Sequence, residues 1–346
     1  MKTERLNYYI PVELIAQQPA DVRSNSKLLV LNRCGDKLLD SRFDRIGDFL
    51  SAGDCLVVND TKVLAARFFA ARRTGSKLEG LFISETTPGV WEVMLKGARK
   101  VKTGEIINLK DHAGADFCTA RILDKPAGDT CRLEIETDTT LLEKIGFAPL
   151  PPYIKRNTDL RQAASDKLRY QTVYARKAGA IAAPTAGLHL TNPLIEQLKG
   201  NGVEFAYITL HVGLGTFKPV TAENLDEHEI HQERFSIDLD NAQIINAAKK
   251  KGRRIIAVGT TSVRTLETAT IGSQVEPVSG TTDLFIKPGY EFKMVDAIVT
   301  NFHLPKSTLL ALVAAFAGLE NVLAAYNHAV QQRYRFYSYG DAMLIV

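Results

Sequence analysis

The sequence predicts an α/β protein with a layered, mainly parallel sheet and flanking helices, interrupted by an inserted small antiparallel β-barrel domain. From residue 180 onward, apolar strand-like segments alternate with helical ones, a pattern typical of parallel sheets covered by helices. Between residues 77 and 137, short β-rich runs are separated by glycine, proline or aspartate clusters, as in small barrels. Because α/β texture lies on both sides of that stretch, we expect the barrel to be an insertion.

The expected strands and a proline-rich stretch place the domain boundaries. Residues 28–31 and 54–58 are expected strands of the α/β part. The expected barrel strands cover residues 78–83, 90–95, 105–109, 117–123 and 131–136. Residues 149–153 predict a stiff exit, because proline fixes φ and removes a hydrogen-bond donor. We therefore expect an α/β catalytic domain from residues 1–61 and 150–346, and a barrel domain from residues 62–149.

The carboxy-terminal half carries start and stop signals for helices. Asn192 is expected to cap a helix that has Pro193 at its first position and ends at Gly200 or Gly202. Gly252 is the expected stop of a helix over residues 240–251. Further helices are expected after Gly259 and over residues 307–316 and 320–333, with strands over 203–211, 254–258 and 295–300.

Composition predicts a soluble cytoplasmic protein. The chain has 346 residues, of which 45% are hydrophobic and 24% charged, and this length suggests about two domains. Its start lacks the apolar run of a secretory leader, and its longest apolar run, residues 309–319, is too short to span a bilayer. The four cysteines form no CxxC pair, which argues against a zinc ribbon or an iron–sulfur cluster.

Positive charge is concentrated rather than large. The net charge is +4, but residues 62–110 hold ten Lys or Arg against four Glu, a net of +6. A second basic cluster comprises Lys155, Arg156, Arg161, Lys167 and Arg169. These segments are either solvated basic faces or a groove that follows nucleic-acid phosphates, and charge alone does not separate the two interpretations.

Polar strings interrupt the apolar elements at several places. They cover residues 59–62, 183–189, 210–217, 258–264, 300–308 and 334–341. Four of them follow predicted strands, and open α/β sheets bind ligands in the crevice beyond the carboxyl ends of their strands. The strings therefore predict a binding crevice at one edge of the α/β domain.

Single strings leave alternatives open. The segment 259–264 could bind an anion at a helix start, or Thr261 or Ser262 could simply cap that helix. The segment 211–215 lacks the third glycine of a dinucleotide fingerprint, and no Walker motif occurs. Residues 228–231 fall short of the HExxH zinc motif because Gln232 follows them, so we expect no metal.

In combination, the strings APTAGLH, TLHVGLGTF, AVGTTSVRTLE, TNFHLPKSTLL and YRFYSYGDAMLI resemble the signature blocks of the S-adenosylmethionine:tRNA ribosyltransferase-isomerase family. The strings LIAQQPA, VVNDTKVLAAR, PLPPYIKR and RYQTVYA are also similar to that family, so the resemblance covers essentially the whole chain. Leu190, Leu214 and Ile230 depart from the expected pattern, but all three are apolar exchanges.

The resemblance implies an α/β domain with an inserted β-barrel and an activity in queuosine biosynthesis. The enzyme would transfer and isomerise the ribosyl part of S-adenosylmethionine onto 7-aminomethyl-7-deazaguanine at the wobble position of tRNA. The products would be epoxyqueuosine-tRNA, adenine and methionine. S-adenosylmethionine would be a co-substrate, the anticodon arm of tRNA the partner, and no cofactor would be bound permanently. We expect a monomer.

The polar strings supply candidate site residues. His189, His211 and His303 are candidates for proton transfer, since the pKa of histidine lies near working pH. Glu233 or Asp341 could face a cationic centre, and Arg264 and Lys306 could hold the methionine carboxylate. Tyr337 or Tyr339 could stack on a base. The other candidates for substrate binding are Thr185, Gly187, Gly213, Gly215, Thr216, Thr260, Thr261, Asn301, Ser307 and Arg335. The candidates for tRNA phosphates are Lys62, Arg67, Arg156 and Arg169.

Two other functions remain open from the residues alone. A non-catalytic tRNA-binding module would bind tRNA without releasing adenine. An enzyme acting on a free nucleoside or nucleotide would turn over without tRNA.

Overall fold

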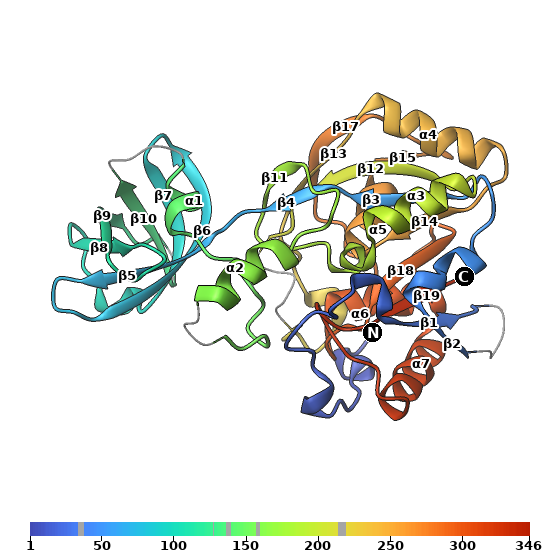
Figure 1. The fold of residues 1–346 in the computed structure, drawn as a ribbon, viewed down its shortest axis with the longest axis horizontal. Coiled ribbons are helices and arrows are strands. Elements are labelled where there is room, and N and C mark those ends of the chain that lie inside the picture. Colours follow the sequence, from blue (N-terminus) through green and yellow to red (C-terminus); the bar gives the residue numbers. More distant parts are fainter. Residues whose placement is uncertain (34–37, 127, 136–139, 157–159, 214–218) are drawn as a thin grey trace. The chain divides into compact units, whose positions relative to one another are not determined.

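The computed structural model describes residues 1–346 except 34–37, 127, 136–139, 157–159 and 214–218. Contacts divide the chain into two compact units (Figure 1). The first unit comprises Met1–Lys62, Pro151–Lys155 and Gln171–Val346, and the second comprises Val63–Leu150 and Arg156–Tyr170. The second unit thus includes a segment that lies beyond the proline-rich stretch.

The first unit is built on a nine-stranded sheet with the order β17-β13-β12-β3-β14-β18-β19-β1-β2. Its strands are β1 (Lys27–Leu31), β2 (Leu38–Arg42), β3 (Cys55–Asn59), β12 (Glu204–Leu210), β13 (Glu233–Ile237), β14 (Ile255–Val258), β17 (Val278–Thr282), β18 (Ala297–Asn301) and β19 (Ala342–Ile345). The pairs β12–β3, β3–β14, β14–β18 and β1–β19 are parallel, whereas the other four are antiparallel. The sheet is therefore mixed, and the prediction of a mainly parallel sheet is right only for its centre.

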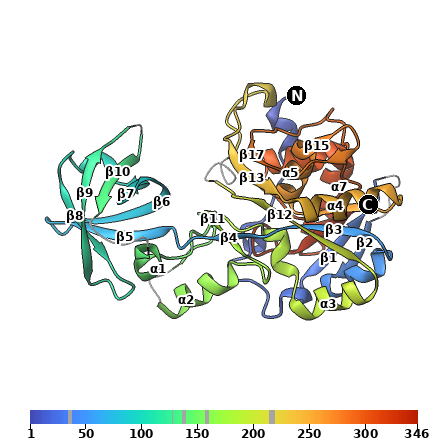
Figure 2. The same ribbon diagram turned by 90° about the horizontal axis from the view of Figure 1, so that it is seen from above.

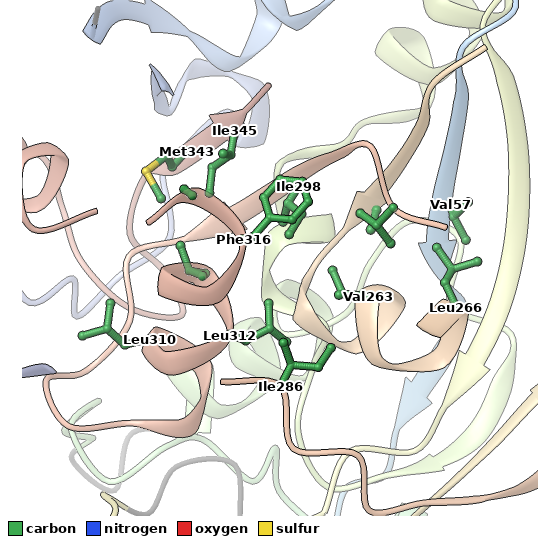
Figure 3. Packing of buried hydrophobic residues seen from close by; sticks show 14 of the residues in the cluster. Val57, Val263, Leu266, Ile286, Ile298, Leu310, Leu312, Phe316, Met343 and Ile345 are labelled. Atoms are coloured by element: carbon green, nitrogen blue, oxygen red, sulfur yellow. The ribbon is translucent and has the colours of Figure 1, made fainter. Parts of the chain in front are cut away.

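Both faces of this sheet are covered, because successive strand residues point to opposite sides. Cys55 and Val57 belong to one apolar cluster, and Leu56 and Val58 belong to the other. The first cluster packs under α4 (Leu239–Lys250), α5 (Thr260–Ala269), α6 (Thr308–Ala317) and α7 (Leu319–Gln331) (Figure 3). The second packs under α3 (Asn192–Gly200) and the 3₁₀ helices η4 (Phe43–Phe49) and η6 (Thr185–His189). Figure 2 shows α3 on the side of the sheet opposite to α4, α5 and α7. The result is a three-layer α/β/α arrangement.

The helices begin at side-chain caps close to the predicted positions. Thr191, rather than Asn192, caps α3, because its hydroxyl accepts a hydrogen bond from the Leu194 amide. Asp238 caps α4 and Ser307 caps α6 in the same way. Neither Thr261 nor Ser262 caps α5. The residue before this helix is Gly259, whose φ is 92°.

Shorter elements complete the first unit. They are the 3₁₀ helices η1 (Thr3–Leu6), η2 (Val12–Leu14), η3 (Arg23–Asn25) and η8 (Leu225–Glu227), and the strands β11 (Lys177–Ala180), β15 (Thr270–Ile271) and β16 (Gln274–Val275). Strand β11 pairs with β4 (Thr61–Val63). In the described part of the chain, no single helix is long and apolar enough to cross a membrane; α6 and α7 meet that criterion only as a pair bent by 113°.

The second unit is an antiparallel sheet of six strands around its own apolar cluster. The strands are β5 (Arg67–Arg72), β6 (Lys77–Thr87), β7 (Val90–Lys96), β8 (Ile106–Lys110), β9 (Asp116–Asp124) and β10 (Thr130–Ile135). The strands pair in the order β10-β7-β6-β5-β8-β9. The two end strands, β9 and β10, also pair with each other, so the sheet closes on itself. The helical elements are η5 (Ala98–Lys100), α1 (Leu141–Ile145) and α2 (Leu160–Arg169).

Candidate functional site

The carboxyl ends of β12, β3, β14 and β18 lie level along one edge of the sheet. Asn59 is in register with Ile208, and Val258 is in register with both Val58 and Val299. Polar residues follow each of these strands. We call this set, residues 59–61, 211–213, 259–261 and 301 with η6, the polar edge. Its position is where open α/β sheets bind ligands.

Asn59 ties three elements of the polar edge together. It is fully buried, and its Nδ2 donates to the Leu210 carbonyl at 2.9 Å and to Thr261 Oγ1 at 3.2 Å. Its Oδ1 accepts from the Leu210 amide at 3.0 Å and from the Thr61 amide at 3.1 Å. The amide therefore holds β3, β12 and the start of α5 in fixed relative positions.

His211 follows β12 and is half-buried. Its Nδ1 lies 2.8 Å from Thr61 Oγ1, whose hydroxyl donates to the Lys177 carbonyl at 3.5 Å. With the hydroxyl proton used there, Thr61 accepts from Nδ1–H, and the lone pair of His211 lies on Nε2. Burial, and then the positive charge of Arg234, lower the pKa of His211, so the ring is neutral near pH 7.

His189 is held in a closed hydrogen-bond network on η6. Ser26 Oγ donates to the Arg23 carbonyl and lies 3.0 Å from His189 Nδ1, which assigns the ring proton to Nδ1. His189 Nε2 then accepts from Asn301 Nδ2 at 3.2 Å, and Asn301 Oδ1 accepts from Thr185 Oγ1 at 2.7 Å. Both ring nitrogens are thus engaged. Burial, with a smaller effect of Arg335, lowers the pKa of His189 to about 3.

These groups form one continuous edge. A side-chain carbon placed on Gly259 would lie 3.7 Å from the Cβ of Ala186, so the turn after β14 lies against η6. The structure therefore brings together His211, Thr261, Asn301 and the η6 residues. Thr260 is buried at the start of α5, beside Thr261.

His303 lies on the other face of the sheet. Its Nε2 is 3.2 Å from Thr300 Oγ1, its Nδ1 is 3.4 Å from the Tyr326 hydroxyl, and its carbonyl accepts from Tyr8. The residue is 8% exposed, and burial lowers the pKa of its ring to about 3. The structure does not bring this histidine to the polar edge.

Glu233 and Arg264 form a buried ion pair beyond β12. Arg264 Nη1 donates to Glu233 Oε2, and its Nε donates to the Leu284 carbonyl at 3.0 Å. The other carboxylate oxygen accepts from the Gly213 amide at 2.8 Å. This pair lines a cavity of about 80 Å³ together with His228, His231 and Phe285. The structure therefore joins the predicted cation-facing acid and the predicted carboxylate-binding arginine.

Asp341 and Arg335 have structural partners. The Asp341 carboxylate accepts from the backbone amides of Lys27 at 3.0 Å and Arg335 at 2.7 Å, and it lies 3.5 Å from Arg335 Nη2. Its side chain is buried at the start of β19. Only its backbone carbonyl reaches the polar edge, where it accepts from Asn301 Nδ2 at 3.3 Å.

The remaining predicted residues of the first unit are spread over its surface and core. Lys306 pairs with Glu4, and Ser307 is committed to capping α6. Tyr337 and Tyr339 are both buried, and the Tyr337 ring lies 4.9 Å from that of Tyr153. Gly215 and Thr216 lie outside the described residues.

The predicted tRNA-binding residues differ in availability. Lys62 is exposed, and Arg169 is half-buried. Arg67 pairs with Glu79 at 2.7 Å, and Arg156 forms a bidentate pair with Asp166 at 2.6 and 2.9 Å. Within the second unit, Arg67 and Arg156 line a cavity of about 540 Å³ with Phe69, His112 and Phe147.

Comparison with known proteins settles the family. The queuosine biosynthesis protein family matches residues 3–345. A protein of Francisella tularensis subsp. novicida (strain U112), named S-adenosylmethionine:tRNA ribosyltransferase-isomerase, is 47% identical over 348 residues and covers 100% of both chains. This chain belongs to the queuosine biosynthesis protein family.

Two further relatives agree with this membership of the queuosine biosynthesis protein family. A protein of the same name from Francisella tularensis subsp. tularensis (strain SCHU S4 / Schu 4) is 47% identical over 100% of this chain and 99% of its own. The crystal structure of an S-adenosylmethionine tRNA ribosyltransferase from Thermotoga maritima is 38% identical, with a TM-score of 0.56 over 99% of this chain and 100% of that one.

Sequence reasoning gives no role to Asn59 and Thr61 of the polar edge in this queuosine biosynthesis protein, nor to Thr172 and Tyr174 beside it. Asn59 and Thr61 lie in the polar string at residues 59–62, and Thr172 and Tyr174 lie in the string RYQTVYA. The signal for the last two is the small size of Gly187. A side-chain carbon there would lie 2.0 Å from the Tyr174 hydroxyl and 3.0 Å from the Thr172 methyl group.

The buried histidines predict a pH dependence of stability. The folded pKa of His303 is about 3 against an ordinary value of 6.5, so the unfolded chain binds the extra proton between these values. Folding stability contributed by neutral His303 is present above pH 6.5 and is lost as pH falls towards 3, by roughly 2 kcal/mol between pH 6.5 and 5. We expect His303→Gln to be less sensitive to that pH change than the wild type, as measured by urea unfolding followed by circular dichroism. Equal pH sensitivity in both proteins would contradict this.

Proposed function

We propose that this protein transfers the ribosyl part of S-adenosylmethionine to 7-aminomethyl-7-deazaguanine at the tRNA wobble position and isomerises it. Epoxyqueuosine-tRNA, adenine and methionine are the products. The observation that carries the proposal is a polar edge with one available neutral histidine in a chain that matches the family from residue 3 to 345. S-adenosylmethionine is a co-substrate, and the enzyme acts in the cytoplasm as a monomer without a resident cofactor.

His211 is the proposed proton-abstracting base. The sulfonium of S-adenosylmethionine acidifies the adjacent C5′ protons, and a base must remove one of them. His211 is half-buried, neutral near pH 7, and its Nε2 has no hydrogen-bond partner among the described residues. His189 is less suited to this step, because both of its ring nitrogens are hydrogen-bonded and its pKa is about 3.

The later steps follow from the ylide formed at sulfur. Elimination opens the ribose and expels adenine, the precursor amine attacks the unsaturated sulfonium, and closure of the epoxide expels methionine as a neutral thioether. Thr185, His189 and Asn301 act in this scheme as a rigid hydrogen-bonding wall that positions the nucleoside. Rigid positioning of reacting groups lowers the activation free energy by several kcal/mol, and by roughly 7–11 kcal/mol at best.

The Glu233–Arg264 pair is the proposed site for the amino-acid end of S-adenosylmethionine. That end carries both an ammonium and a carboxylate. Next to Gly213, the Glu233 carboxylate could face the ammonium and the Arg264 guanidinium could face the carboxylate. Lys306 has no part in this assignment, because it pairs with Glu4.

The second unit is the proposed tRNA-binding domain, a small β-barrel inserted in an α/β catalytic domain. Its segment over residues 63–110 holds nine Lys or Arg against four Glu, so most of the concentrated positive charge lies in this unit. Its cavity is lined by Arg67 and by the rings of Phe69 and Phe147. Proteins that bind single-stranded nucleic acid use cationic side chains for the phosphates and aromatic rings for stacking on the bases.

The activity is tested by incubating the purified protein with S-adenosylmethionine and tRNA that bears the precursor base. We expect adenine release together with a mass gain on the tRNA. Binding of tRNA without adenine release would favour a non-catalytic module. Turnover without tRNA would favour an enzyme that acts on a free nucleoside.

We expect His211→Gln to lower kcat for adenine release by about a hundredfold or more, because proton transfer by a positioned side chain contributes that much. In the wild type, kcat falls as pH drops through a value below 6.5, the ordinary pKa of histidine. The matched control is His303→Gln, which removes a histidine that lies away from the polar edge. Similar kcat values in the wild type and His211→Gln would rule out this base.

We expect Lys62→Gln to weaken tRNA binding through the loss of about one phosphate contact. The slope of the logarithm of the binding constant against the logarithm of the salt concentration should become shallower by roughly 0.7–0.9. Lys62 is exposed, so its ammonium is available to a phosphate. Lys199→Gln is the control, since Lys199 lies on α3 at its carboxyl end, which leads to the opposite edge of the sheet. An unchanged slope in Lys62→Gln would exclude the phosphate contact.

A further inference from the structure

Two hydroxyl groups beside the polar edge are buried without a hydrogen bond. Among the described residues, neither Tyr174 Oη nor Thr172 Oγ1 has a partner. Thr172 is 5% exposed, and the hydroxyl oxygen of Tyr174 is buried although the side chain as a whole is half-buried. A buried polar atom without a partner costs roughly 1–3 kcal/mol. Two such atoms only two positions apart in the chain therefore point to a ligand that supplies the missing hydrogen bonds.

Both residues face the same glycine. The position of a side-chain carbon on Gly187 is 2.0 Å from Tyr174 Oη and 3.0 Å from Thr172 Cγ2, so only glycine leaves room for them. Gly187 belongs to η6, two residues from Thr185 and two from His189. The two hydroxyls are thus next to the wall formed by Thr185, His189 and Asn301.

The surroundings of Tyr174 favour a neutral ligand group. Its ring lies 6.3 Å from that of Tyr207, and it packs in the apolar cluster on the η6 face of the sheet. Burial raises the pKa of Tyr174, so the hydroxyl keeps its proton and can donate it. Charged ligand groups need charged partners when they are buried, whereas two neutral hydroxyls suit the neutral polar atoms of a nucleoside.

We infer that Tyr174 and Thr172 hydrogen-bond the adenosine portion of S-adenosylmethionine, and that Gly187 is glycine so that the Tyr174 hydroxyl and the Thr172 side chain have room beside η6. The inference rests on the proposed function and adds two substrate-binding residues to it. It divides the substrate between two places: the neutral nucleoside lies beside η6, and the charged amino-acid end lies beside the Glu233–Arg264 pair.

The test uses Tyr174→Phe and Thr172→Val, which remove only the hydroxyl groups. With saturating precursor-bearing tRNA, we expect each variant to raise KM for S-adenosylmethionine about threefold to tenfold, the usual effect of one neutral hydrogen bond. The inhibition constant of adenosine should rise by a similar factor. Because the hydroxyls have no partner among the described residues, the thermal unfolding midpoint should stay the same or rise.

Tyr326→Phe is the matched control. The Tyr326 hydroxyl accepts from the His303 amide at 3.0 Å, so its loss should lower the unfolding midpoint and leave KM unchanged. An unchanged KM in both Tyr174→Phe and Thr172→Val would overturn the inference alone, and a raised KM with an unchanged adenosine inhibition constant would overturn the assignment to the nucleoside. Absence of adenine release by the wild type would instead overturn the proposed function and this inference with it.

Discussion

The buried amide of Asn59 is the contact on which the polar edge depends. It satisfies both backbone groups of Leu210, receives the Thr61 amide and donates to Thr261. All four hydrogen bonds lie at the point where parallel strands end together, so one side chain holds the positions of three segments of this edge. Loss of any of these bonds would leave a buried polar group unpaired, at a cost of roughly 1–3 kcal/mol. The edge is therefore rigid before substrate arrives, which suits a site that must align a sulfonium, a base and an amine.

The three candidate histidines differ in burial and therefore in pKa. His189 and His303 are enclosed on opposite faces of the same sheet, and the loss of water lowers the pKa of each to about 3. They are neutral hydrogen-bonding groups over the whole physiological range. His211 lies at the strand end, where it is only half-buried, and it keeps one ring nitrogen unbonded within the described part of the chain. Three histidines that are equivalent by residue type thus differ in burial and in the hydrogen bonds of their ring nitrogens.

The sequence predicted the regular elements well where the pattern was long. The strands at 54–58 and 254–258 and the helices after Asp238 and Ser307 lie within a few residues of their expected places. It missed β5, whose ends are arginines, and β19, which has four residues directly after a polar string. It also missed β13 and β17. Because β19 pairs antiparallel with β18, β13 with β12 and β17 with β13, the missed strands account for three of the four antiparallel pairs that make the sheet mixed.

The sequence by itself determined the family and the order of polar strings after apolar strands, because both are properties of consecutive residues. Tertiary structure alone decided which candidates are available for chemistry. Arg264 is joined to Glu233 across 31 positions, Thr61 to His211 across 150, and Asn301 to His189 across 112. Charge pairing, proton location and pKa depend on neighbours in space and on burial, and neither can be obtained from local order along the chain.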